Sequence, residues 1–114
     1  QGMGETLLAA NEANFYTLTD RATWLSMRGF DIRTNKLPNL AIVFGGETID
    51  ENPDKQLHNP YGVMMVNPEK FPGVNAAMAK NFVQWLVSRE TQNAIGEYGK
   101  GKFGQALFYA NAAK

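Results

Sequence analysis

The apolar residues of this 114-residue chain follow two patterns, one with helical spacing and one continuous. The first pattern, together with capping residues, predicts helices over Glu5 to Glu12, Arg21 to Met27, Asn75 to Val87 and Glu90 to Tyr98. The second predicts strands over 40–44 and 61–66, because a strand that is covered on both faces is apolar throughout. A third, short strand is predicted over 15–18, which is rich in aromatic and β-branched residues. The alternation of helices and strands predicts an α/β fold with three visible strands.

Polar residues and glycines mark where the predicted helices begin and end. Thr19 or Asp20 can cap the second helix, and Gly29 would stop it. Ser88 can cap the last helix, which Gly99 would end. These signals are local, so they predict helix boundaries without any knowledge of the tertiary structure.

Three strands make a poor sheet by themselves, because their edges and faces need cover. We therefore expect partner strands from an absent segment or from another molecule, and incomplete sheets within this chain. The composition divides the chain into three blocks, 1–46, 47–59 and 60–114, of which the middle one is polar and contains Asn52-Pro53. This middle block is predicted to be a connector.

Charge and composition exclude several classes of protein. The chain has 11 basic and 11 acidic residues, which argues against a nucleic-acid binder and against a polybasic membrane-surface protein. It has no cysteine, so disulfides, thiolate zinc sites and cysteine nucleophiles are excluded. No apolar run approaches membrane-spanning length, and the first residues do not form a signal peptide. Position 1 is not Met, so we expect the chain to be a piece of something longer.

Two segments combine donors with a chain turn that leads into a helix. Gln1–Thr6 contains two glycines and opens the first helix, where main-chain N–H groups can hold an anion. Thr17–Arg21 lies where a predicted strand passes into a helix, and it offers the Thr19 hydroxyl and the Arg21 guanidinium. The alternative for both segments is an ordinary turn and helix cap, with a solvated Arg21.

Evidence for catalysis is weak. His58 is the only histidine, Ser26 and Ser88 have no base nearby in sequence, and the acidic residues of 47–54 lack calcium-loop spacing. We therefore predict no catalytic residue, no metal site and no cofactor. Trp24 and Trp85 lie on predicted helices with apolar neighbours, and packing is the expectation for both.

Several segments resemble one protein family, in order and over most of the chain. They are 1–7 (QGMGETL), 10–12 (ANE), 16–24 (YTLTDRATW), 59–70 (NPYGVMMVNPEK) and 82–92 (FVQWLVSRETQ). The set resembles the periplasmic tungstate-binding proteins of ABC transporters. The segments 16–24 and 59–70 are fairly specific, whereas 82–92 is common to many solute-binding proteins. The chain departs from the family in spacing between Gly29 and Asn39 and in a Gly/Lys-rich tail before Phe108.

The resemblance implies a two-lobed type II periplasmic-binding-protein fold, of which this chain would be the C-terminal half. Residues 1–46 would belong to the second lobe, 47–59 would contain a hinge, and 60–114 would belong to the first lobe. The family's best-known anion-contact motifs are absent from this chain. The positions that carry over as ligand-binding candidates are Gln1, Gly2, Met3, Gly4, Thr19 and Arg21.

The function implied is binding of tungstate or molybdate for import through an ABC transporter permease. The expected location is the periplasm, or the cell exterior with a membrane anchor in Gram-positive relatives. The expected structural partner is a missing N-terminal half or, by domain swapping, a second copy. The alternative function is the effector-binding domain of a transcriptional regulator of the LysR type, which shares the two-lobed fold. A small hydrolase is the third hypothesis, disfavoured because no base–nucleophile set is found.

Overall fold

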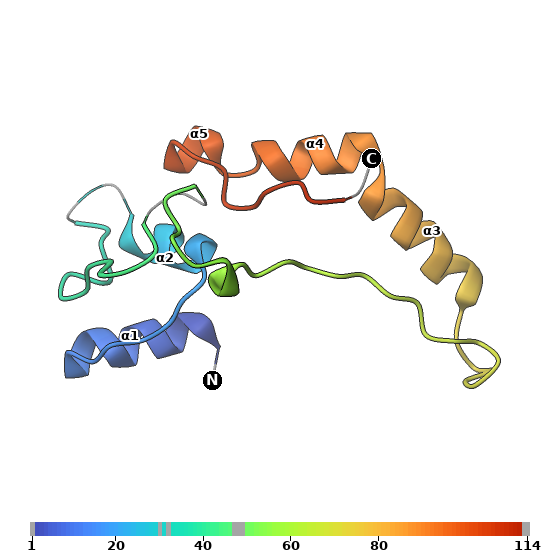
Figure 1. Ribbon diagram of the computed structural model, residues 1–114, viewed down its shortest axis with the longest axis horizontal. Helices are drawn as coiled ribbons and strands as arrows, with labels where there is room; N and C mark the ends of the chain where they lie inside the picture. The colour runs from blue at the N-terminus through green and yellow to red at the C-terminus, as the bar shows by residue number, and fades with distance from the viewer. Residues whose placement is uncertain (1, 30, 32, 47–49, 113–114) are drawn as a thin grey trace. The chain divides into compact units, whose positions relative to one another are not determined.

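The computed structural model describes residues 2–29, 31, 33–46 and 50–112 (Figure 1). The chain forms two units, each defined by contacts among its own residues. Unit 1 consists of Gln1–Asn59 and Gly99–Leu107, and unit 2 consists of Pro60–Tyr98 and Phe108–Lys114. Each unit contains helices of its own.

Unit 1 contains four of the helical segments, namely α1 Met3–Ala13, α2 Arg21–Arg28, the 3-10 helix Lys55–Leu57 and α5 Lys100–Phe103. Asp20 caps α2 and Gly29 ends it, as predicted, and the helix runs one residue past the predicted Met27. Helix α1 begins two residues earlier than predicted and ends one residue later. The 3-10 helix and α5 were not predicted.

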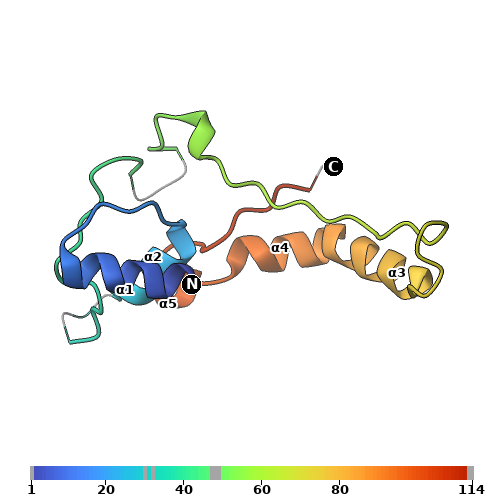
Figure 2. The ribbon, with the colours of Figure 1, turned by 90° about the horizontal axis from the view of Figure 1, so that it is seen from below.

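The chain reverses direction after α1. Asn14 adopts the left-handed conformation at the end of this helix, with φ of 56°, and its N–H donates to the carbonyl of Ala10. An Asn tolerates this conformation better than most residues, which makes it suited to a helix C-cap. The following segment runs back beside α1, so that α1 and α2 begin on the same side of unit 1 (Figures 1 and 2).

The core of unit 1 is small and apolar. Helices α1 and α2 pack together, and the buried cluster is completed by a loop residue and by the chain around α5. Its members are Leu7, Trp24, Leu25, Leu37, Phe103 and Leu107. Burying one such side chain contributes roughly 1.5–3 kcal/mol to folding. The burial of Trp24 confirms the packing role expected for it.

Unit 2 contains α3 Ala76–Val87 and α4 Arg89–Glu97, which contact each other. The Asn75 side chain accepts a hydrogen bond from the N–H of Met78, and the Ser88 hydroxyl accepts one from the N–H of Thr91. The Ser88 cap was predicted, and both helices lie within one residue of their predicted ranges. Trp85, however, is 57% exposed, so its expected packing role is wrong for this chain.

The predicted strands are a further correction. Among the described residues there is no β-strand, and 15–18, 40–44 and 61–66 lie outside every helix and pair with no neighbouring strand. Tyr16, Val43 and Met64 are 90%, 75% and 89% exposed, although their segments have the composition of covered strands. A strand needs a hydrogen-bonded neighbour, and sequence pattern does not supply one. The prediction of an α/β fold with three visible strands is therefore wrong, and the described chain is helical with extended connections.

None of the helices in the described part of the chain has both the length and the apolar character needed to cross a membrane.

Candidate functional site

The start of α1 is already occupied by a carboxylate of the same helix. The N–H of Gly2 donates to Glu5 Oε2 at 3.2 Å, and the Thr6 hydroxyl donates to the Gly2 carbonyl at 3.1 Å. Glu5 at the positive end of the helix dipole stabilises the helix by about 0.3–1 kcal/mol. The same negative charge opposes an anion at Gly2, which would have to displace the Glu5 carboxylate or bind beside it.

The two glycines of this turn have different surroundings. A Cβ on Gly4 would lie 3.3 Å from Met27 Sδ, so Gly4 allows α1 to approach α2. A Cβ on Gly2 would meet nothing within 4 Å. Of the two candidates, only Gly2 leaves open space for a ligand. Met3 is partly exposed beside it, and Gln1 lies outside the described residues.

Asp20 caps the N-terminus of α2. Its Oδ1 accepts from the N–H of Thr23 and its Oδ2 from the Thr23 hydroxyl, both at 2.8 Å. The Thr19 hydroxyl donates to the carbonyl of Asp20 at 3.1 Å. Thr19 can therefore donate to a ligand only after its hydroxyl turns away from this carbonyl. The interpretation of Asp20 as a helix cap is confirmed.

Arg21 is not simply solvated. It is half-buried, and its Nη1 donates to the carbonyl of Gly46 at 3.3 Å. A guanidinium has five N–H donors, so the remaining donors stay available for an oxyanion. Gly46 has φ of 70°, and a Cβ there would collide with Glu51. Sequence reasoning singled out Arg21 but had no signal for its contact with Gly46, 25 residues away.

The candidate residues share one region of unit 1. Gly2 and Met3 begin α1, while Thr19 and Arg21 precede and begin α2, and the two helices start on the same side (Figures 1 and 2). A groove formed by described residues lies elsewhere, in unit 2, and its lining is apolar apart from Asn75. An oxyanion needs several N–H and hydroxyl donors, so this groove does not suit one.

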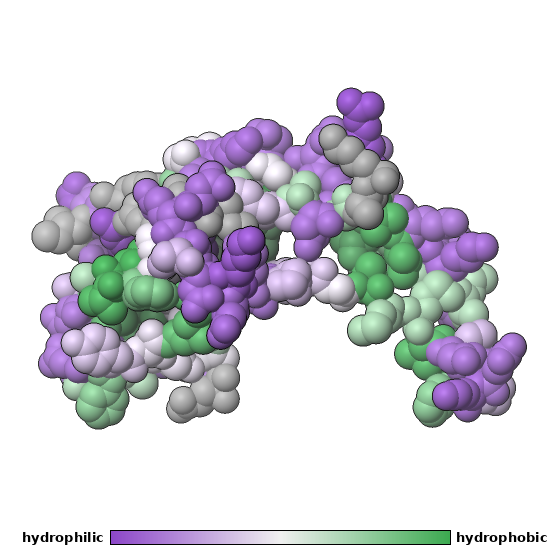
Figure 3. Space-filling model, viewed as in Figure 1, coloured by the Kyte–Doolittle hydropathy of each residue, from purple (hydrophilic) through white to green (hydrophobic). Residues whose placement is uncertain are grey.

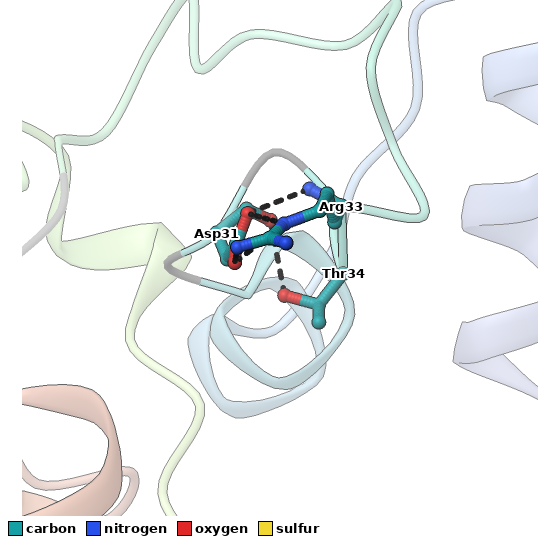
Figure 4. A network of polar contacts seen from close by, with 3 residues as sticks. All are labelled: Asp31, Arg33 and Thr34. Carbon is teal, nitrogen blue, oxygen red and sulfur yellow. Dashed lines mark hydrogen bonds and ion pairs between the residues drawn. The ribbon is translucent and has the colours of Figure 1, made fainter.

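Arg33 is engaged with a neighbouring carboxylate (Figure 4). The Nη2 of Arg33 lies 3.2 Å from Asp31 Oδ2, and the main-chain N–H of Arg33 donates to Asp31 Oδ1 at 2.9 Å. The Thr34 hydroxyl donates to the Asp31 carbonyl at 3.0 Å. The main-chain N–H of Arg33, and then its guanidinium, hold the pKa of Asp31 below its usual value. The charge of Arg33 is thereby balanced within its own loop, whereas Arg21 forms no ion pair with any described residue.

Residues suited to holding metals do not come together in the described part of the chain, where no group of three or more His, Cys, Asp or Glu side chains could bind a metal ion. His58 is exposed in the connector after the 3-10 helix.

Comparison with known proteins gives a consistent picture. This chain is 43% identical over its whole length to the tungstate-binding protein TupA of Peptoclostridium acidaminophilum, of which the match covers 35%. It is 39% identical over 98% of its length to a candidate ABC transporter anion-binding protein of Haloferax volcanii, covering 30% of that protein. It is 33% identical over 86% of its length to the tungstate-binding protein TupA of Campylobacter jejuni, covering 33% of that protein.

The chain thus spans about a third of the length of the curated relatives it matches. No solved structure matches it. The PBP superfamily domain family matches residues 1–90, which is most of the chain. The chain therefore belongs to the PBP superfamily domain family.

Proposed function

We propose that this chain is part of an extracytoplasmic solute-binding protein that binds a tetrahedral oxyanion, tungstate or molybdate, for an ABC importer. The observation that carries the proposal is the 43% identity over the whole chain to a protein named for tungstate binding. The resemblance of 16–24 and 59–70 to that family supports it. Binding without chemical conversion fits the residues, since no base–nucleophile set was found in the sequence.

The residues of this chain would supply a minority of the anion's contacts. The main-chain N–H groups of the Gln1–Gly4 turn, the Thr19 hydroxyl and the Arg21 guanidinium are the proposed donors. Three of these donors already have a partner within the chain, namely Glu5 for the N–H of Gly2, the Asp20 carbonyl for Thr19 and the Gly46 carbonyl for Arg21. The other donors of a closed site would come from residues outside these 114, consistent with the third of the relatives' length that the chain spans.

The proposed organisation follows the two-lobed family. Residues 1–46 would lie in one lobe and 60–114 in the other, except that Gly99–Leu107 pack into the core of unit 1. A hinge would lie in 47–59, and an ABC transporter permease would be the receiving partner. The location would be the periplasm, or the outer face of an anchoring membrane. Completion by an N-terminal half is the proposed arrangement, and completion by a domain-swapped second copy is its alternative.

A chimera tests the proposal in a complete protein. This chain would replace the 117 matched residues of the Peptoclostridium acidaminophilum protein, and tungstate, molybdate and sulfate binding would be measured by calorimetry. We expect tungstate or molybdate to bind more tightly than sulfate. Arg21→Gln should weaken binding at least about tenfold, because a charge-assisted hydrogen bond is lost. The matched control is Arg33→Gln, since Arg33 is paired with Asp31. A folded chimera that binds none of the anions would contradict the proposal.

A further inference from the structure

Unit 1 encloses its apolar residues, whereas unit 2 leaves many of its own at the surface. Every buried apolar residue of the described chain belongs to unit 1. Figure 3 shows hydrophobic residues, drawn in green, at the surface beside α3 of unit 2. A polar atom in the core of unit 1 is therefore separated from bulk water by residues of this chain itself, and its hydrogen bonds must be formed within that core.

Two side-chain atoms in unit 1 are buried and have no hydrogen-bond partner among the described residues. They are the indole nitrogen Nε1 of Trp24 and the carboxamide oxygen Oε1 of Gln105. Trp24 as a whole is only 6% exposed. Buried polar atoms of folded proteins nearly always have a partner, because the loss of hydration is costly without a replacement. These two atoms therefore indicate a hydrogen-bonding group that the described residues do not supply.

The two atoms belong to segments that pack in the same cluster. Trp24 lies on α2 and shares the buried core of unit 1 with Phe103 and Leu107. Gln105 lies between these two residues in the chain, directly after Gly104, which ends α5. The indole of Trp24 and the carboxamide of Gln105 thus belong to one part of the core, so that a single group can serve both.

The chemistry of the two atoms restricts what that group can be. An indole N–H only donates a hydrogen bond, and a carboxamide oxygen only accepts one. A shared partner must therefore accept from Trp24 and donate to Gln105. An anion could accept from Trp24 but would oppose the Gln105 oxygen, and a metal ion is not bound by an indole N–H.

Burial restricts the size of the partner. Because residues of unit 1 cover both atoms, a segment of another polypeptide could reach them only by opening this core. A water molecule is small and uncharged, and it both donates and accepts hydrogen bonds. A buried water needs at least two polar partners, which these atoms provide. It would also serve Gln105 if the carboxamide were turned so that its nitrogen faced inward.

We propose that unit 1 contains a structural water site, in which one water molecule accepts a hydrogen bond from Trp24 Nε1 and donates one to Gln105 Oε1. The water joins α2 to the segment that follows α5. Since Arg21 is the first residue of α2, the site holds in place the helix that carries this proposed anion donor. The water site itself does not depend on which anion is bound.

Nitrogen-edited NMR that detects magnetisation transfer from water tests the proposal on the 114-residue chain. The chain has two tryptophans, so a Trp85→Phe variant assigns both indole signals. We expect the indole proton of Trp24 to show the cross-peak of a long-lived bound water. Trp85 is 57% exposed and serves as the internal control, because its indole should meet only short-lived surface water.

Gln105→Met removes the acceptor and keeps a side chain of similar length. We expect the Trp24 cross-peak to weaken at least about twofold, because the water loses one of its two hydrogen bonds. Gln56→Met is the matched control, since Gln56 is exposed in unit 1, and it should leave the cross-peak unchanged.

Two results would overturn the proposal. A wild-type chain without the Trp24 cross-peak would show that this indole holds no water, and this measurement needs no variant to fold. A cross-peak that is equally strong in Gln105→Met would show that Gln105 is not a partner of the water.

Discussion

Two hydrogen bonds join Asn39, in the loop after α2, to Asn11 on α1. The N–H of Asn39 donates to Asn11 Oδ1 at 2.9 Å, and Asn39 Nδ2 donates to the Asn11 carbonyl at 3.1 Å. Asn11 is buried, although it lies on a helix whose other buried residues are apolar. This pair fixes the loop that brings Leu37 into the core.

Replacing Asn11 with Ala should destabilise unit 1 by about 0.5–1.5 kcal/mol, because the main-chain N–H of Asn39 loses its hydrogen bond to the Asn11 side chain. Urea denaturation measures this change in the free energy of unfolding, followed by the fluorescence of Trp24 in a Trp85→Phe background so that only unit 1 is reported. Asn93→Ala is the control, since Asn93 is exposed on α4. Equal stabilities of the two variants would show that the Asn pair contributes nothing.

Two glycines near the end of the chain should respond in opposite ways to alanine. Gly99 has φ of 91°, and a Cβ there would lie 2.6 Å from Leu107 Cγ in the core. Gly99→Ala should therefore cost about 1–2 kcal/mol for the backbone alone, and more for displacing Leu107. Gly101 lies within α5 with nothing near its missing Cβ, so Gly101→Ala should be neutral or stabilise by up to about 1 kcal/mol. Thermal denaturation of both variants checks the difference, and a Gly99→Ala variant that is as stable as the wild type contradicts it.

The carboxylate of Asp20 should weaken oxyanion binding at the start of α2. Asp20→Asn keeps an acceptor for the N–H of Thr23 but removes the negative charge. In the chimera we expect tungstate to bind about two- to fivefold more tightly, which corresponds to the usual effect of one charge at a helix end. Asp54→Asn is a matched control, because Asp54 caps the 3-10 helix through the N–H of Gln56. If both substitutions change affinity equally, the anion does not lie near α2.

The loop of Asp31 should be sensitive to acid. Its pKa is lowered in the folded chain, so the hydrogen bonds of its carboxylate are fully present above its unfolded pKa. They are lost as pH falls through the lower, folded value. An NMR titration of the Asp31 carboxyl carbon measures this pKa. Arg33→Gln should raise it only partly, because the main-chain N–H of Arg33 is the larger cause and remains. An unchanged pKa in this variant would remove the guanidinium from the explanation.

The helices could be predicted because their signals lie within a few residues of each helix end. Strand pairing and burial depend on residues far apart in the sequence, and the predictions for the three strands and for Trp85 were wrong. Caps such as Asp20 and Ser88 act within three residues of themselves, so sequence was sufficient to place the beginnings of α2 and α4. The three predicted strands failed because their composition shows only that they suit a covered position, whereas a strand also requires a neighbour. The predicted packing role of Trp85 was wrong for the same reason, because no described residues bury its side chain.

In the candidate site, too, local features could be predicted from the sequence and contacts between distant residues could not. The Thr19–Asp20 turn follows from residue types, but the contact of Arg21 with Gly46 joins positions 25 residues apart. Nothing in the spacing of either residue indicates it. Helix α5 was missed because it is four residues long and bounded by Gly99 and Gly104, which in sequence resemble a loop.

Titration of tungstate into the 114-residue chain by calorimetry, with its monomeric state verified by light scattering, tests the central claim most directly. If the chain supplies only part of an oxyanion site, the monomer should bind tungstate far more weakly than the chimera does. Affinity in the monomer equal to that of the chimera would show that these 114 residues form the complete site, and the claim that other residues complete it would be wrong.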